Sequence, residues 1–164
     1  MNRFFLFVIF LFSFFPASAQ TYFFKNFTVE NGLPQSQVLS IFQDASGRLW
    51  IGTNQGGIAR YDGNTFENIT ETNGLAGNVV YSIEQGNDGL LYIGTTKGLS
   101  IYDGKKIKNF TTENGLSNNG VVKVFKDRKG KILLGTGKGV CVLEGDTIIP
   151  VSYTHLTLPT NREV

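Results

Sequence analysis

An internal repeat is the feature of this sequence that most constrains its fold. The triplet Asn-Gly-Leu occurs at residues 31–33, 73–75 and 114–116. Twenty residues after each Asn comes a second triplet, Ile-Gly-Thr at 51–53 and 93–95 and Leu-Gly-Thr at 134–136. Because the copies keep one phase, each is a structural unit, and units of about 40–45 residues are typical of stacked repeat folds.

Each unit has the pattern of four short strands. In the second unit we expect strands at 79–85, 90–95, 99–102 and 107–111, because β-branched and aromatic residues dominate them and Gly or Asp-Gly separates them. The first two strands of a unit are apolar on both faces and must be covered on both sides. The pattern therefore predicts an all-β fold: a partial β-propeller of about three four-stranded blades plus one N-terminal strand, residues 23–28.

Several glycines have predicted structural roles in this fold. Those of the second triplet should let the backbone of an adjacent blade approach closely: Gly52, Gly94 and Gly135. Asp44 and Asp127 each precede a Gly by three residues, which suits a hairpin turn with Gly at a positive φ. In the Asn-Gly-Leu triplets we expect Gly at a turn and Leu packed between blades.

The triplets Asn-Phe-Thr at 26–28 and 109–111 and Asn-Ile-Thr at 68–70 also read as glycosylation sites. They share one phase in the repeat, which favours Asn and Thr on one face of a strand with the apolar residue pointing inward. Glycosylation is the lesser alternative. A phosphate-binding loop would need a helix after the Gly-rich loop, whereas residues 121–125 are strand-like.

The two ends of the chain differ from the repeats. Arg3, an apolar run at 4–15 and the sequence Ala-Ser-Ala at 17–19 predict a signal peptide over residues 1–19, cleaved before Gln20. We therefore expect an exported, periplasmic mature chain of repeats over residues 20–151. Residues 152–164 lose the phase of the repeat, and we interpret them as a non-native tail that ends an N-terminal fragment of a longer protein.

The composition favours binding over catalysis. The single cysteine, Cys141, lies in an apolar stretch, and the single histidine, His155, lies in the out-of-phase tail, so no Cys–His pair or metal-ligand cluster is expected. We expect no cofactor and no metal. A net charge of +2 without basic runs interleaved with aromatics argues against nucleic acid. The carboxylates that a glycosidase would need all fall at predicted turns: Asp44, Asp62, Asp88 and Asp103.

Residues 31–63, NGLPQSQVLSIFQDASGRLWIGTNQGGIARYDG, closely resemble the repeat of the two-component regulator propeller family. Residues 73–104 and 114–145 resemble it more loosely, since Tyr92 and Leu133 stand where the first copy has Trp50. Members of this family are typically periplasmic sensors of Bacteroidetes-like bacteria. Their propellers precede a transmembrane segment and a cytoplasmic output module, commonly a histidine kinase, and some respond to oligosaccharides.

The resemblance implies a ligand-sensing module that is not itself an enzyme. Its partners would be an oligosaccharide or another small periplasmic ligand, the remaining propeller blades, and the downstream transmembrane and kinase segments. Two alternatives stay open: a propeller-fold glycan-active enzyme, either a hydrolase or a lyase, and a secreted adhesion or scaffold propeller.

The topology of a blade also suggests where a ligand would bind. If the first strand of each unit is innermost, the Asn-Gly-Leu connection and the loop after Ile-Gly-Thr lie at the same end of the blade. Polar residues of these loops would then converge on one mouth of the central channel, a usual place for a binding site. The predicted ligand-binding residues are Gln35, Asn54, Gln55, Asn78, Thr96, Lys97, Asn118, Asn119 and Lys138.

Overall fold

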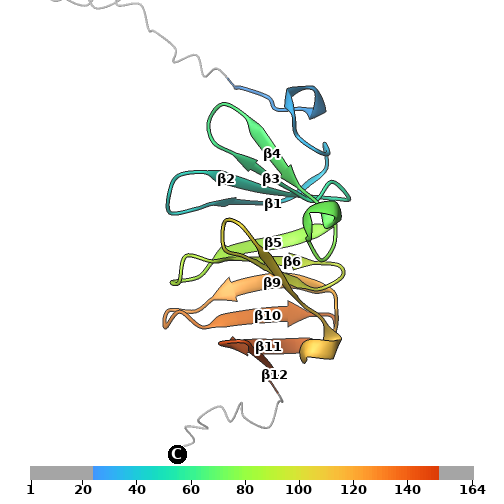
Figure 1. Ribbon diagram of the computed structural model, residues 1–164, viewed down its shortest axis with the longest axis vertical. Coiled ribbons are helices and arrows are strands. Elements are labelled where there is room, and N and C mark those ends of the chain that lie inside the picture. Colours follow the sequence, from blue (N-terminus) through green and yellow to red (C-terminus); the bar gives the residue numbers. More distant parts are fainter. Residues whose placement is uncertain (1–23, 152–164) are drawn as a thin grey trace, which may run out of the picture.

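The computed structural model describes residues 24–151 and contains three four-stranded antiparallel sheets stacked face to face (Figure 1). The predicted signal peptide and the out-of-phase tail lie outside the described residues. The first blade comprises β1 (Val38–Gln43), β2 (Leu49–Thr53), β3 (Ile58–Tyr61) and β4 (Phe66–Ile69). The second comprises β5 (Val80–Gln85), β6 (Leu91–Thr95), β7 (Leu99–Tyr102) and β8 (Ile107–Phe110). The third comprises β9 (Val121–Lys126), β10 (Ile132–Thr136), β11 (Gly139–Glu144) and β12 (Thr147–Pro150).

The strands of each blade pair in sequence order, each with the next. The first strands lie side by side from blade to blade, since β1 contacts β5 and β5 contacts β9. The fourth strands β4, β8 and β12 form the opposite edges of the sheets. The prediction of an all-β partial propeller with three four-stranded blades is therefore confirmed, with the first strand of each blade innermost.

The predicted N-terminal strand is not formed. Residues 24–28 have irregular backbone, although they occupy the same place in the repeat as β4 and β8. A strand needs a partner for its ladder of hydrogen bonds, and no strand within residues 24–151 pairs with this segment. Phe27 packs instead on the first blade, with its ring centroid 5.0 Å from that of Tyr61 and 5.4 Å from that of Phe66.

A one-turn 3-10 helix leads into each blade: η1 (Val29–Asn31), η2 (Glu71–Asn73) and η3 (Thr112–Asn114). The Asn-Gly-Leu triplet ends this turn. In the second copy the Asn73 side-chain oxygen accepts a hydrogen bond from the Thr70 backbone N–H at 3.0 Å, and Gly74 has a φ of 98°. Leu75 is 3% exposed and lies in the apolar core between the first two blades. The expected roles of Gly and Leu are confirmed here.

The asparagines of the glycosylation-like triplets have a structural role. The Asn68 side-chain amide donates to the backbone carbonyl of Gly32 at 3.1 Å, and Asn109 donates to that of Gly74 at 2.8 Å. Each therefore ties the fourth strand of a blade to the Asn-Gly-Leu connection that precedes the blade. This agrees with the interpretation of these triplets as repeat elements.

The glycine in the middle of each second strand lies where two blades meet. A β-carbon on Gly52 would lie 2.6 Å from Cγ1 of Val80 in the next blade, and one on Gly94 would lie 2.7 Å from the carbonyl oxygen of Val121. Both distances are shorter than any contact a real β-carbon tolerates, so the prediction of close interblade approach is confirmed for these two. Gly135 would meet only Lys123 of its own sheet, at 3.4 Å, since no blade within residues 24–151 faces it.

The Asp44 carboxylate holds the first hairpin turn to the interblade core. One oxygen accepts hydrogen bonds from the backbone N–H groups of Ser46 (2.9 Å) and Arg48 (3.0 Å), and the other accepts from Arg48 Nε (2.8 Å) and from the buried Trp50 Nε1 (2.9 Å). Burial alone would raise the pKa of this carboxyl, but the hydrogen bonds from Trp50 and Arg48 together hold it below its ordinary value. Gly47 follows at a φ of 82°, as predicted for this turn.

We expect the Asp44→Ala substitution to lower the free energy of unfolding by about 1–3 kcal/mol, because it leaves the buried Trp50 indole N–H without an acceptor. Trp50 is the single tryptophan of the chain, so urea unfolding followed by its fluorescence measures the effect at this site. The matched control is Asp127→Ala, since Asp127 accepts only from the turn N–H groups of Lys129 and Lys131. Equal losses in the two variants would contradict the assigned role of the indole hydrogen bond.

Candidate functional site

The two kinds of loop that were predicted to form the ligand site do lie together at one end of each blade. In the first blade the Asn54 backbone N–H donates to the Gln37 carbonyl at 2.9 Å, and the Asn54 side-chain amide donates to the Gln37 side-chain oxygen at 2.7 Å. In the second blade Thr96 donates to the Val79 carbonyl at 3.2 Å. This end, which we call the loop face, also carries the 3-10 turns. It lies opposite the hairpins that join the first and second strands of each blade (Figure 1).

Each blade contributes three of the nine predicted residues to the loop face, and none of the nine is buried. Some of their polar atoms are already used inside the loops. The side-chain oxygen of Asn78 accepts from the Glu71 backbone N–H at 2.8 Å, and that of Asn119 accepts from the Thr112 N–H at 2.7 Å. Contact of these nine residues with a ligand stays a prediction.

Glu71 belongs to the loop face but was missed from the sequence. Its two oxygens accept from the Asn78 backbone N–H (3.1 Å) and from Lys97 Nζ (2.7 Å), so it joins the two loops of the second blade. The hydrogen bond from Lys97 is the main cause of its lowered pKa. The sequence did contain a signal that this residue is unusual. Glu71 lies two residues before the Asn of its Asn-Gly-Leu triplet, whereas Glu30 and Glu113 each lie one residue before the Asn of theirs.

Gln55 is the one residue of the loop face with a strained backbone. Among the described residues it is the only non-glycine with a positive φ, at 72°. It stands in the loop where the first repeat has one residue more than the second. Non-glycine residues in this region cost energy and cluster at functional sites.

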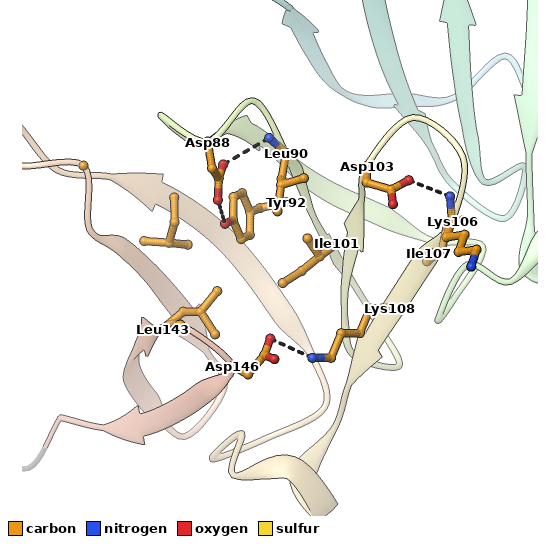
Figure 2. Close-up of a pocket in the computed structure, with 13 residues that line it drawn as sticks. Asp88, Leu90, Tyr92, Ile101, Asp103, Lys106, Ile107, Lys108, Leu143 and Asp146 are labelled. Carbon is orange, nitrogen blue, oxygen red and sulfur yellow. Dashed lines mark hydrogen bonds and ion pairs between the residues drawn. The ribbon is translucent and has the colours of Figure 1, made fainter.

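A separate cleft of about 750 Å³ opens between the second and third blades, at the hairpin end of the sheets (Figure 2). Its walls are apolar, with Tyr92 and Ile101 from the second blade and Ile132 and Leu143 from the third. Its rim is charged: Asp88, Asp103, Lys106, Lys108 and Asp146. Lys108 Nζ lies 2.6 Å from the Asp146 carboxylate, so an ion pair joins the two blades across the cleft. None of the nine predicted residues lines it.

The sequence model of the two-component regulator propeller matches residues 32–55 and 74–97. These segments are two-component regulator propeller repeats. Each covers an Asn-Gly-Leu connection from its Gly onward, the two inner strands and the loop that follows them, and therefore includes most of the loop face of its blade.

One curated relative is Histidine kinase P4 of Formosa agariphila, with 43% identity over 65 residues, which is 37% of this chain and 5% of that protein. A similar solved structure is the extracellular domain of a protein of B. thetaiotaomicron described as a hybrid two component system. Its TM-score is 0.67 at 25% identity, and the match covers 76% of this chain and 18% of that domain. The chain thus spans a small part of the proteins that it resembles.

Two further solved structures share the fold. The extracellular domain of a B. thetaiotaomicron protein described as a one component system has a TM-score of 0.64 at 24% identity, over 77% of this chain and 20% of that one. A catalytically inactive virginiamycin B lyase from Staphylococcus aureus has a TM-score of 0.58 at 17% identity, over 78% and 43% of the two chains. At these identities the similarity shows the propeller fold alone. No helix within residues 24–151 has the length and apolarity of a membrane span.

Proposed function

We propose that this chain is part of the extracytoplasmic, ligand-sensing propeller of a two-component receptor. The observation that carries the proposal is the match of residues 32–55 and 74–97 to two-component regulator propeller repeats. Each matched segment contains the two inner strands of a complete four-stranded blade. The similarity to an extracellular domain of a two-component system supports the location, as does the signal-peptide pattern of residues 1–19.

In this proposal the loop face binds an oligosaccharide or another small periplasmic ligand. The exposed side-chain amide of Gln55 is a neutral hydrogen-bond donor, and the exposed ammonium of Lys97 is a charged one. Binding would favour one arrangement of the remaining blades and of the transmembrane and kinase segments that follow, because a ligand shifts a conformational equilibrium only through differential affinity.

A catalytic role is less well supported by the described carboxylates. Asp62 accepts from the backbone N–H groups of Thr65 and Asn64, which lower its pKa, and Asp103 is held in the same way by Lys106 and Lys105. A glycosidase general acid needs a raised pKa, which these turn residues do not have. Their hydrogen bonds give them a structural function in the hairpins.

The test uses the complete receptor with a transcriptional reporter of its output. Candidate oligosaccharides are screened for one that changes the output, and the dose response is then repeated with Lys97→Ala and Gln55→Ala. We expect the half-maximal concentration to rise about tenfold in each variant, the equivalent of one lost polar contact.

The matched control is Asn64→Ala, which changes an exposed polar residue at the opposite end of the first blade. Its dose response should equal that of the unmodified receptor. An unchanged response in both loop-face variants would show that the ligand binds elsewhere, and output that no ligand changes would contradict the sensing function.

A further inference from the structure

The inner strand of each blade has a one-residue bulge at the same place in the repeat. In β1 the pairing with β2 shifts between Val38 and Ser40, so Leu39 has no partner across the ladder. The same shift leaves Tyr81 unpaired in β5 and Val122 unpaired in β9. Bulges re-aim a side chain and are over-represented next to functional sites. We call Leu39, Tyr81 and Val122 the bulge residues.

In the second blade the bulge turns the two neighbours of Tyr81 to opposite faces of the sheet. Val80 is fully buried and faces the first blade, since its Cγ1 lies 2.6 Å from the place of a β-carbon on Gly52. The Ser82 hydroxyl faces the third blade, where it accepts a hydrogen bond from the Val124 backbone N–H at 3.1 Å. Tyr81 therefore points to neither neighbouring blade. It extends from the free inner edge of the sheet, because β5 pairs only with β6.

The Tyr81 side chain is 38% exposed, although a blade covers each face of its sheet. Its exposure therefore belongs to the inner edge of the blade and not to an uncovered face. Tyr61, Tyr92 and Tyr102 each form a hydrogen bond from the hydroxyl to an acceptor in their own blade, whereas the Tyr81 hydroxyl forms none within residues 24–151. An exposed ring with an unused hydroxyl offers a ligand both an apolar face and a hydrogen-bond donor.

The other two bulge residues are also apolar and exposed, Leu39 at 37% and Val122 at 50%. Because β1, β5 and β9 lie side by side, the three bulge residues form an apolar strip along the inner edges of the blades. The strip borders the loop face, since the Val79 carbonyl, two residues before Tyr81, accepts from the Thr96 backbone N–H. An apolar surface beside a few polar groups is the usual composition of a small-molecule site.

The two loops beside Tyr81 have no unpaired charge. Residues 70–79 and 96–98 contain one carboxylate and one ammonium, those of Glu71 and Lys97, and these pair at 2.7 Å. Their other polar side chains are the hydroxyls of threonines and the amides of asparagines. A buried charge is costly unless it is paired, so these loops favour a neutral ligand that can exchange hydrogen bonds with them. A sugar ring has these properties, with an apolar C–H face and hydroxyl groups at its edge.

We propose that Tyr81 is a ligand-contacting residue of the site at the loop face, and that a neutral sugar ring lies on its phenol ring. Leu39 and Val122 extend the apolar contact to the neighbouring blades, and the Tyr81 hydroxyl donates to a hydroxyl of the sugar. The inference rests on the sensing function proposed above and adds to it a contact residue and the charge of the ligand. A rigid aromatic side chain loses little conformational entropy on binding, which suits it to this role.

The test uses membranes that contain the complete receptor and a panel of neutral di- to tetrasaccharides of glucose, mannose, galactose, xylose, arabinose and fructose. Saturation-transfer NMR measures binding, and the transcriptional reporter measures output. We expect at least one neutral sugar to bind with a Kd of about 1 mM or lower. Tyr81→Ala should weaken its binding at least about tenfold, and Tyr81→Phe, which keeps the ring, by about threefold or less. Leu39→Ser, a second variant of the strip, should weaken it by about threefold.

The control is Asn64→Ala at the opposite end of the first blade, which should bind as the unmodified receptor does. Receptor level in the membrane and basal output show that each variant is folded. The inference is overturned if no neutral sugar binds, if trigalacturonate binds as tightly as the best neutral sugar, or if folded Tyr81→Ala binds normally. Output that responds normally in Tyr81→Ala also overturns it and leaves the sensing function standing. Sugar binding that Tyr81→Ala weakens, without any change of output, supports the contact and contradicts the sensing function.

Discussion

The Gly94→Val substitution should lower the free energy of unfolding by about 1–3 kcal/mol, the usual cost of overpacking a filled core. A β-carbon at this position would lie 2.7 Å from the backbone carbonyl oxygen of Val121 and 3.1 Å from its side chain. A backbone atom cannot rotate out of the way, so the second and third blades must separate to admit the new side chain. A thermal melt at matched protein concentration measures the loss.

The control for this prediction is Gly135→Val, the same change at the same repeat position of the third blade. There a β-carbon would meet only Lys123 of its own sheet at 3.4 Å, an ordinary contact distance. We expect a loss of less than half that of Gly94→Val. Equal losses in the two variants would mean that the effect comes from placing Val in a second strand, and that the blades do not meet at Gly94.

The sequence predicted the blades well because their determinants are local and recur in phase. Strand residues, the Gly of the first hairpin turn and the Gly at the interblade position all repeat at a common offset, and all have the expected geometry in the first two blades. The strand predicted at residues 23–28 failed for the opposite reason. Its residues match the fourth strand of a blade, but a fourth strand also needs a third strand beside it, and pairing of that kind is not a local property.

Burial of individual strand residues was harder to predict. The inner strands are apolar on both faces, so alternation cannot say which residues point to the next blade. Trp50 in β2 and Val124 in β9 are fully buried, whereas Ile41 in the neighbouring strand β1 and Phe125 in β9 are exposed. The register of the strands decides which side chains point to the next blade. That register depends on the bulge between Val38 and Ser40 in β1 and on the equivalent bulge in each of the other two blades.

The loop face and the interblade cleft also differ in how far the sequence predicts them. The loop face could be predicted, because it follows from strand order and from which loops share an end. The interblade cleft could not, although the exchange of Trp50 for Tyr92 is visible in the sequence. Its size depends on Tyr92, Ile101 and Leu143 together, and these come from three strands in two blades.

Residues 20–151 alone should self-associate in solution. The face of the first blade that points away from the second exposes Leu39 and Ile41, the latter at 67%, and the corresponding face of the third blade exposes Phe125 at 53% and Ile149 at 45%. On the third blade these residues belong to one row, since Phe125 pairs with Leu133, Leu133 with Val142 and Val142 with Ile149. Between blades, equivalent residues such as Tyr92 are covered, so an uncovered row is an apolar patch that favours association.

Size-exclusion chromatography with light scattering, followed by a thermal melt, tests most directly whether the uncovered faces of the first and third blades are packing surfaces for further blades. We predict a mass above that of the monomer and a broad transition for residues 20–151. The double substitution Ile41→Lys and Phe125→Lys should shift the mass toward the monomer, because it places a charge on each bare face, and Lys105→Ala at an exposed turn should not. A monodisperse monomer with one sharp transition for the unmodified chain would contradict the account.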